Sequence, residues 1–341
     1  MLSLRRIATR AAPAVGRRGL QATSARIRLY SQASQDSQNS QAPQNSQAPQ
    51  NSQASQDSQD SQDPEADPYY KPPKYPNAVS LAYDLHHPRR PHTTWREDPI
   101  LFLHGLFGSR KNNRTISNVL ARDLGRYVYC LDLRNHGDSP HNPKHDYLSM
   151  ADDVAAFIEE HRLMSPTIIG HSMGAKTAMT LALREPELVS NIIAVDNAPV
   201  DVTLSRDFAK YVRAMKKIDD ANVTRQAEAD KILSEYEESL PIRQFLLGNM
   251  YQPPGEKFRK FKIPLDILAK SLDNCGDFPY KDPNEIRYEK PALFVRGTKS
   301  KYVPDELLPL IGQFFPKFRL VDVDAGHWLI SEQFEAFRLG M

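Results

Sequence analysis

The chain has 341 residues, of which 40% are hydrophobic, enough to bury the core of one large domain or of two small ones. Its two cysteines, Cys130 and Cys275, are too few for a disulfide framework or a structural zinc site, which excludes the small disulfide-rich secreted proteins. The formal net charge is only +2. No stretch approaches the roughly 18 consecutive apolar residues that span a bilayer, so the sequence predicts no transmembrane segment.

The first 30 residues differ in composition from the rest of the chain. They hold seven arginines and no acidic residue, and alanine, serine and leucine fill much of the space between. This composition is typical of a mitochondrial transit peptide, so we expect residues 1–30 to direct the protein to the mitochondrial matrix. Their removal would change the formal net charge from +2 to −5. The excess of positive charge therefore comes from this segment alone, and we expect no nucleic-acid partner.

Residues 31–66 consist almost wholly of Ser, Gln, Asn, Asp, Ala and Pro, and the sequence SQAPQN occurs twice in tandem. Such a segment cannot bury enough apolar surface to offset the entropy lost on ordering. We therefore expect a disordered linker, with a partner-binding tail as the alternative.

After the linker, short β-rich runs alternate with helical patterns. This alternation predicts an α/β fold with a mostly parallel sheet flanked by helices. Residues 67–198 would form the first part of this core and residues 290–341 the second. Ser149 and Asp152 predict the start of one helix, which runs to His161. The predicted strands cover residues 78–85, 99–104, 127–133, 166–170, 192–196, 291–297 and 318–324.

Between the two parts of the core, residues 199–289 contain no predicted strand and read as helices and loops. In residues 206–218, for example, apolar side chains recur on one face of a helix. Because α/β sheets bind ligands outside the carboxyl ends of their strands, we expect this segment to be a helical lid over those ends.

The strongest local signal is the segment Gly170-His171-Ser172-Met173-Gly174. It follows a predicted strand and precedes an expected helix, which is the strand–turn–helix arrangement of a nucleophile elbow. Glycines are needed on both sides of the serine because the turn is strained and side chains there would collide. The pattern therefore predicts Ser172 as a catalytic nucleophile.

A serine hydroxyl is a useful nucleophile only when a base takes its proton and an acid orients that base. In proteins with a nucleophile elbow, these residues follow the chain order serine, acid, histidine. His327 directly follows the last predicted strand, and it is the only histidine after His171. We therefore expect His327 to be the base.

The acid is less simple to assign. In the loop after the penultimate predicted strand, where it is usual, the chain has Ser300. A neutral hydroxyl cannot stabilise the imidazolium that forms during attack, and removing the charge of a triad carboxylate lowers kcat about 10⁴-fold. Asp196 ends the strand beside the nucleophile strand and is the preferred acid. Other carboxylates stay open as alternatives: Asp305, Asp322 and Asp324.

The glycine-containing loop at residues 104–108 follows another predicted strand and supplies one half of an expected oxyanion hole. Its donors would be the backbone amides of Leu106 and Met173, aimed at charge that develops on an acyl oxygen. Residues 134–139 are expected to brace this loop by hydrogen bonds. No histidine or cysteine spacing indicates a metal site and no cofactor motif is present, so we expect neither.

These segments resemble the mitochondrial α/β-hydrolase group that includes α/β hydrolase domain-containing protein 11, its bacterial esterase relatives and the fungal ethanol acetyltransferases. The resemblance implies the α/β-hydrolase fold and, through the VDNAPV segment, Asp196 as the acid. The chain ends at Met341, 14 residues after His327, so the last helix is short, and a short helix there could loosen the loop that holds His327. The matching segments are HGLFGS (104–109), LDLRNHGDSPH (131–141), GHSMGAK (170–176), VDNAPV (195–200), IRQFLLGNM (242–250), LFVRGTKSKYV (293–303) and AGHW (325–328).

The resemblance implies acyl transfer through a serine ester. Our primary expectation is hydrolysis of carboxylic esters or thioesters of short acyl groups, with small-molecule substrates. The first alternative is an alcohol acetyltransferase that makes ethyl acetate from ethanol, with acetyl-CoA as acyl donor. The second alternative is a non-catalytic partner of matrix dehydrogenase complexes.

Overall fold

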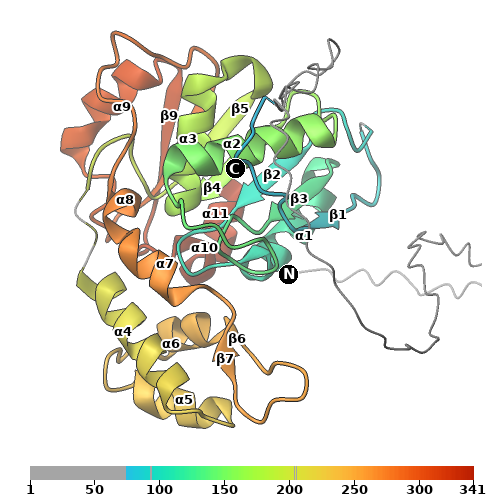
Figure 1. Ribbon diagram of the computed structural model, residues 1–341. Coiled ribbons are helices and arrows are strands. Elements are labelled where there is room, and N and C mark those ends of the chain that lie inside the picture. The colour runs from blue at the N-terminus through green and yellow to red at the C-terminus, as the bar shows by residue number, and fades with distance from the viewer. Residues whose placement is uncertain (1–73, 93, 203, 205) are drawn as a thin grey trace, which may run out of the picture. The chain divides into compact units, whose positions relative to one another are not determined.

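The computed structural model describes residues 74–92, 94–202, 204 and 206–341 (Figure 1). Within them, seven short strands pair into one sheet in the order β1-β3-β2-β4-β5-β8-β9. In this sheet, β1 pairs antiparallel with β3, and all the other strand pairs are parallel. The predicted α/β fold is therefore confirmed. The strands are β1 Tyr83–His86, β2 Ile100–Leu103, β3 Val128–Leu131, β4 Thr167–His171, β5 Asn191–Val195, β8 Ala292–Gly297 and β9 Phe318–Val323. The expected transit peptide and linker lie outside the described residues.

The central strands β2, β3 and β4 are buried along their whole length, because helices cover both faces of the sheet. In β4, Ile168 packs into the core on one face and Ile169 into the core on the other, as alternation along a strand requires. The helices of the first face are α2 Tyr147–Glu160, α3 Met173–Arg184 and α9 Leu308–Phe314; those of the second are α1 Arg114–Leu124, α10 Leu329–Glu332 and α11 Phe334–Gly340. Short 3-10 helices lie at Arg110–Asn113, Pro186–Leu188 and Asp305–Leu307.

The predicted start of α2 was wrong. The helix begins at Tyr147, and its cap is Asp146, whose carboxylate accepts a hydrogen bond from the Ser149 amide at 2.7 Å. Asp146 lies in extended backbone, as a capping residue does, and satisfies an amide that the first helical turn leaves without a partner. Ser149 is thus the residue whose amide is capped.

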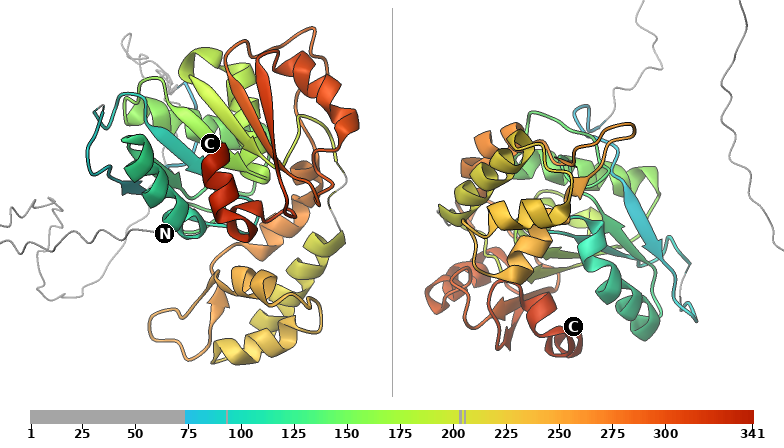
Figure 2. Two further views of the ribbon diagram at one scale, coloured as in Figure 1. Left: turned by 180° about the vertical axis from the view of Figure 1, so that it is seen from behind. Right: turned by 90° about the horizontal axis from the view of Figure 1, so that it is seen from below.

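Residues 199–289, here called the inserted segment, lie between β5 and β8 in the chain, and α4, α5, α6, β6 and β7 of this segment lie at one end of the sheet (Figures 1 and 2). The apolar side chains predicted to share one face of α4 are buried, among them Phe208 and Met215. The prediction that the segment holds no strand was wrong, because β6 and β7 form an antiparallel pair. With two residues each, they are too short for alternation to mark them in the sequence. The elements are α4 Arg206–Asp220, α5 Gln226–Leu233, α6 Leu240–Leu247, β6 Met250–Tyr251, β7 Lys260–Phe261, α7 Leu265–Lys270 and α8 Leu272–Gly276.

None of the helices in the described part of the chain combines the length and the hydropathy that a membrane crossing requires.

Candidate active site

Ser172 occupies the sharp turn between β4 and α3. Its backbone has φ 53° and ψ −113°, a strained conformation for a residue with a side chain. The glycines on either side allow the turn to close. A Cβ at Gly170 would lie 2.1 Å from the Gly174 carbonyl oxygen, and one at Gly174 would lie 2.6 Å from the Leu103 carbonyl oxygen. The expected elbow geometry is therefore present, with Ser172 at its apex.

The structure brings the three residues predicted from the sequence together at the carboxyl ends of β4, β5 and β9. His327 Nδ1 lies 2.7 Å from Asp196 Oδ2, and His327 Nε2 lies 3.0 Å from Ser172 Oγ. Because a carboxylate can only accept, the proton of the neutral ring is on Nδ1, and Nε2 accepts from the serine hydroxyl. The arrangement can therefore remove the Ser172 proton when the hydroxyl attacks an acyl carbon.

The Asp196 carboxylate is fully buried and is satisfied by donors on both oxygens. Oδ1 accepts from the Gly297 amide at 3.1 Å, and Oδ2 accepts from the Ser300 hydroxyl at 2.5 Å as well as from His327. Asp196 has a positive φ of 51°, which is uncommon for a residue with a side chain. The loop after β8 thus holds the carboxylate although it does not supply it.

The three alternative carboxylates point to other partners. Asp305 and Asp322 both accept from the Arg296 guanidinium, at 2.5 and 2.6 Å. Asp324 pairs with the Lys299 ammonium at 3.0 Å. All three are exposed, and in the described part of the chain their carboxylates make no hydrogen bond to His327.

The two amides expected to form the oxyanion hole, those of Leu106 and Met173, donate to no other group within the described residues. The loop that carries Leu106 lies against the nucleophile, since a Cβ at Gly105 would lie 3.3 Å from Ser172 Cβ. Both amides are therefore free to bind an oxygen on the substrate.

Two buried histidines hold this loop, as expected for the bracing interaction. His136 Nδ1 donates to the Arg134 carbonyl oxygen, and its Nε2 accepts from the Phe107 amide at 3.1 Å. His104 Nδ1 donates to the Gly105 carbonyl oxygen, and His104 Nε2 accepts from the Leu133 amide at 3.0 Å. Burial lowers the pKa of His104 to about 4 and that of His136 to about 3, so both rings are neutral and can accept.

Residues 98–334 match the family described as alpha/beta hydrolase fold. The chain belongs to the α/β-hydrolase family. It is 41% identical over 256 residues to a probable alcohol acetyltransferase of Saccharomyces cerevisiae, with 69% of this chain and 73% of the relative covered. It is 37% identical over 265 residues to the sn-1-specific diacylglycerol lipase ABHD11 of Xenopus tropicalis, with 76% and 80% covered. The resemblance predicted from the motifs is therefore confirmed.

Among solved structures, this hydrolase is similar to a marine microorganism esterase. The TM-score is 0.70 and the sequence identity is 35%, and the match covers 77% of this chain and 98% of the esterase. Hydrolase, lipase and acyltransferase relatives together support the conclusion that this α/β-hydrolase is an enzyme.

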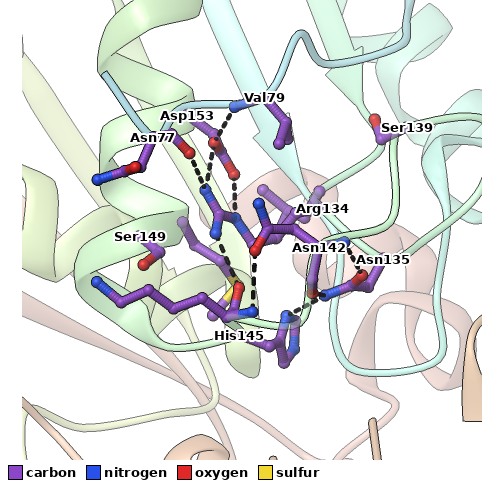
Figure 3. Close-up of polar contacts among 12 residues, drawn as sticks. Asn77, Val79, Arg134, Asn135, Ser139, Asn142, His145, Ser149 and Asp153 are labelled. Atoms are coloured by element: carbon purple, nitrogen blue, oxygen red, sulfur yellow. Dashed lines mark hydrogen bonds and ion pairs between the residues drawn. The ribbon is translucent and has the colours of Figure 1, made fainter. Parts of the chain in front are cut away.

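Sequence reasoning missed the buried polar network beneath the bracing loop (Figure 3). The fully buried Arg134 guanidinium donates to both carboxylate oxygens of Asp153 on α2, at 2.6 and 2.7 Å, and to the Lys144 carbonyl oxygen at 2.8 Å. The next residue, Asn135, donates from Nδ2 to the Asn142 carbonyl oxygen at 2.9 Å. The arginine in the segment LDLRNHGDSPH indicated that a charged partner was needed, but the sequence did not show that this partner is Asp153, which lies on a separate helix. The network fixes the loop that carries the histidine brace.

Three contacts hold the loop that carries His327. The Tyr302 ring stacks on the His327 ring with centroids 4.2 Å apart. His171 Nε2 donates to the His327 carbonyl oxygen at 2.8 Å. The Gly326 amide donates to the Glu332 carboxylate of α10 at 2.7 Å. Burial, together with neighbouring His327, lowers the pKa of His171, so it does not add a positive charge beside His327.

A cavity of about 670 Å³ opens beside the elbow, within the size range of small-molecule sites. Its apolar wall includes Phe245 of the inserted segment and Trp328, whose ring centroids lie 4.6 Å apart. Among the described residues that line it, Glu332 is the acidic one, and none is a lysine or an arginine. The remaining lining is His104, Gly105, Gly108, Asn112, Asn113, His171, Ser239, Pro241, Ile242, Gln244, Ile330 and Ser331.

Proposed function

We propose that this hydrolase transfers acyl groups through a covalent ester on Ser172, with His327 as general base and acid and with Asp196 as the carboxylate that orients it. The observation that carries the proposal is the continuous hydrogen-bond chain from Ser172 through His327 to Asp196, next to two backbone amides that have no other partner. This combination matches the requirements of serine-based acyl transfer.

In the first half-reaction, Ser172 Oγ attacks the acyl carbon while its proton passes to His327 Nε2. The carbonyl oxygen becomes an oxyanion, which the amides of Leu106 and Met173 stabilise. The bond to the leaving group then breaks, and His327 gives its proton to the departing alcohol or thiol. In the second half-reaction, His327 takes a proton from water, the resulting hydroxide attacks the ester, and the proton returns to Ser172 Oγ as the acid leaves. Asp196 keeps its charge throughout.

We assign water as the principal acyl acceptor and carboxylic esters or thioesters as substrates. The likeness to a marine microorganism esterase and to a diacylglycerol lipase supports hydrolysis. Short acyl groups remain the expectation, and the cavity volume leaves room for a larger alcohol or thiol part of the substrate. A series of p-nitrophenyl esters of increasing chain length tests this assignment. A steady rise in kcat/KM from the acetyl ester to long chains would contradict it.

The alternative acceptor is an alcohol, as the likeness to a probable alcohol acetyltransferase suggests. Acetyl-CoA would then be the acyl donor, and its phosphates need cationic partners. The described lining of the cavity beside the elbow holds no lysine or arginine to bind these phosphates, so the transferase stays the alternative. Comparing acetyl-CoA with the acetyl thioester of N-acetylcysteamine tests this point, because only acetyl-CoA carries the phosphates. A much higher kcat/KM for acetyl-CoA would show that its phosphates contribute to binding, and the products then decide the acceptor.

The partition between water and ethanol separates the two acceptors directly. The purified protein receives p-nitrophenyl acetate with and without dilute ethanol, and free acetate and ethyl acetate are measured by gas chromatography. Hydrolysis predicts that acetate remains the main product. If ethyl acetate forms faster than acetate in dilute ethanol, the hydrolase assignment is wrong and the transferase assignment takes its place.

A matrix location rests on the arginine-rich composition of residues 1–30. Import into isolated mitochondria tests it, because the full chain should become protease-protected and a chain without residues 1–30 should not. A matrix location would also permit the non-catalytic alternative, a partner of dehydrogenase complexes. If Ser172→Ala restored every phenotype of a strain that lacks the protein, that alternative would replace the catalytic proposal.

A further inference from the structure

Asn249 connects the inserted segment to the loop after β2. It lies between α6 and β6 and is only 9% exposed. Its side-chain Nδ2 donates to the Phe107 carbonyl oxygen at 2.8 Å and to the Leu246 carbonyl oxygen at 3.1 Å. Both amide protons of this side chain thus have acceptors, one in its own segment and one in the core.

The acceptor in the core belongs to the residue that follows Leu106. Phe107 has a φ of 61° and is almost completely buried. Its amide donates to His136, which belongs to the core, and its carbonyl oxygen accepts from Asn249, which belongs to the inserted segment. The two peptide groups on either side of Phe107 are therefore each fixed by a hydrogen bond. The Gly108 amide shares its peptide group with the Phe107 carbonyl and donates to the Gly105 carbonyl oxygen at 2.9 Å. Because the Gly105 carbonyl shares its peptide group with the Leu106 amide, fixing the Phe107 carbonyl also constrains the direction of the Leu106 amide.

A second contact ties the same part of the inserted segment to the neighbouring loop. The Lys262 amide donates to the Asn249 carbonyl oxygen at 2.9 Å, and the Lys262 ammonium forms an ion pair with Asp138. The Asp138 amide in turn donates to the buried Asp132 carboxylate at 2.8 Å. The inserted segment thus contacts the loop that carries Leu106 and also the loop that braces it.

We propose that Asn249 is a positioning residue for the oxyanion hole, so that the inserted segment, and not the core alone, aims the Leu106 amide at the acyl oxygen. The inference rests on the proposed acyl transfer and adds a specific residue to it. It assigns the inserted segment a part in the chemical step besides any part in covering the cavity. Displacing this segment would then disable the oxyanion hole as well as open the site.

Asn249→Asp tests the proposal with almost no change in volume. It replaces the Nδ2 donor by a carboxylate oxygen, which repels the Phe107 carbonyl oxygen instead of binding it. Removing one oxyanion-hole donor lowers kcat about 10²- to 10³-fold, so misaiming one should lower kcat by about 10- to 100-fold. KM for p-nitrophenyl acetate should change less than about threefold, because the amide binds the transition state more strongly than the substrate. Asn249→Ala removes the donor without adding charge and should show the same split.

A trifluoromethyl ketone gives a second readout, because it forms a tetrahedral adduct on Ser172 whose oxygen occupies the oxyanion hole. Its affinity should fall in parallel with kcat in both Asn249 variants. The comparison variant is Asn274→Asp, since Asn274 of α8, which is exposed where Asn249 is buried, also donates from Nδ2 to a core carbonyl oxygen, that of His145, at 3.2 Å. Thermal unfolding of each variant shows whether it is folded at the assay temperature.

The expected result is a loss of kcat and of ketone affinity in the Asn249 variants, with Asn274→Asp close to the wild type in both. Unchanged kcat in folded Asn249→Asp and Asn249→Ala would overturn the inference, and so would an equal loss in Asn274→Asp. Ser172→Ala separates this outcome from failure of the proposed function. If Ser172→Ala abolishes turnover while the Asn249 variants are unaffected, the acyl-transfer proposal stands and the inference alone is wrong.

Discussion

The Ser300 hydroxyl donates a hydrogen bond to Oδ2 of Asp196 at 2.5 Å, the same oxygen that accepts from His327 Nδ1. Ser300 stands where a catalytic carboxylate is usual, so its contact with Asp196 connects the two positions from which an acid could serve the histidine. Together with the Gly297 amide, it holds the carboxylate in the orientation that the His327 ring requires. The acid thus comes from the end of β5 and not from the loop after β8, but its carboxylate still lies beside the imidazole.

Replacing the acid should separate Asp196 from the other carboxylates. Asp196→Asn removes the charge that stabilises the His327 imidazolium, and we expect kcat/KM to fall by about 10⁴-fold. Asp305→Asn is the matched control, because Asp305 is exposed and paired with Arg296. Kinetics with p-nitrophenyl acetate provide the measurement. A large loss in Asp305→Asn with an active Asp196→Asn would reverse the assignment.

The proximity of Ser300 to Asp196 predicts that the acid can be moved between the two positions. Asp196→Ser should be nearly inactive, whereas Asp196→Ser combined with Ser300→Asp should recover at least about tenfold in kcat/KM, since the new carboxylate starts within reach of His327 Nδ1. Both variants need circular dichroism spectra like those of the wild type. A folded double variant with no recovery would show that the loop after β8 cannot present a carboxylate to the ring.

The buried histidines predict loss of stability in mild acid. Burial lowers the pKa of His104 to about 4 and those of His136 and His145 to about 3, below their ordinary value of 6.5. Below pH 6.5 the unfolded chain therefore binds more protons than the folded chain, and the free energy of unfolding falls as the pH falls. Each histidine contributes at most about 1.4 kcal/mol per pH unit between pH 6 and pH 4.

Urea unfolding at pH 7, 6 and 5 measures this dependence. His171, whose pKa burial also lowers, contributes in the same direction, so His145→Gln should remove about a quarter of the slope that the four histidines contribute. A free energy of unfolding that stays constant from pH 7 to pH 5 would contradict the assignment of these rings as neutral and buried.

The pair of Arg134 and Asp153 should be sensitive to the loss of one partner. Both side chains are fully buried, so Arg134→Met leaves an unpaired carboxylate in the core and should lower the free energy of unfolding by about 3–5 kcal/mol. Lys299→Met, which breaks the exposed pair with Asp324, should change it by less than about 1 kcal/mol. Denaturant titration of both variants provides the comparison, and equal effects would contradict the buried-pair account.

The sequence predicted the parts of the site that depend on local pattern. The elbow around Ser172 and the position of His327 after the last strand are readable because each is set by neighbours in the chain. Asp196 required an argument from charge and from its place at the end of the neighbouring strand, and the resemblance through the VDNAPV segment supported it. All seven strands of the sheet were predicted for the same local reason, although β1 begins at Tyr83 and not at residue 78. The two-residue strands β6 and β7 were missed because they are too short to show a pattern.

The contacts that hold the site could not be predicted in this way. The stacking of Tyr302 on His327 and the bond from Asn249 to Phe107 join segments that are far apart in the sequence, and they depend on how loops pack in three dimensions. No periodicity marks such a pair, because each member is a single polar or aromatic residue in an irregular segment. The sequence therefore indicated the reacting groups more readily than the groups that position them.

The measurement that tests the central claim most directly is the mass of the enzyme during turnover. Rapid mixing with p-nitrophenyl acetate, an acid quench and peptide mass spectrometry should find one acetyl group on the peptide that contains Ser172. The rate of its formation should match the initial burst of p-nitrophenol, and Ser172→Ala should show neither the adduct nor the burst. An acetyl group on another residue that forms at the catalytic rate, or full turnover by Ser172→Ala, would contradict the account.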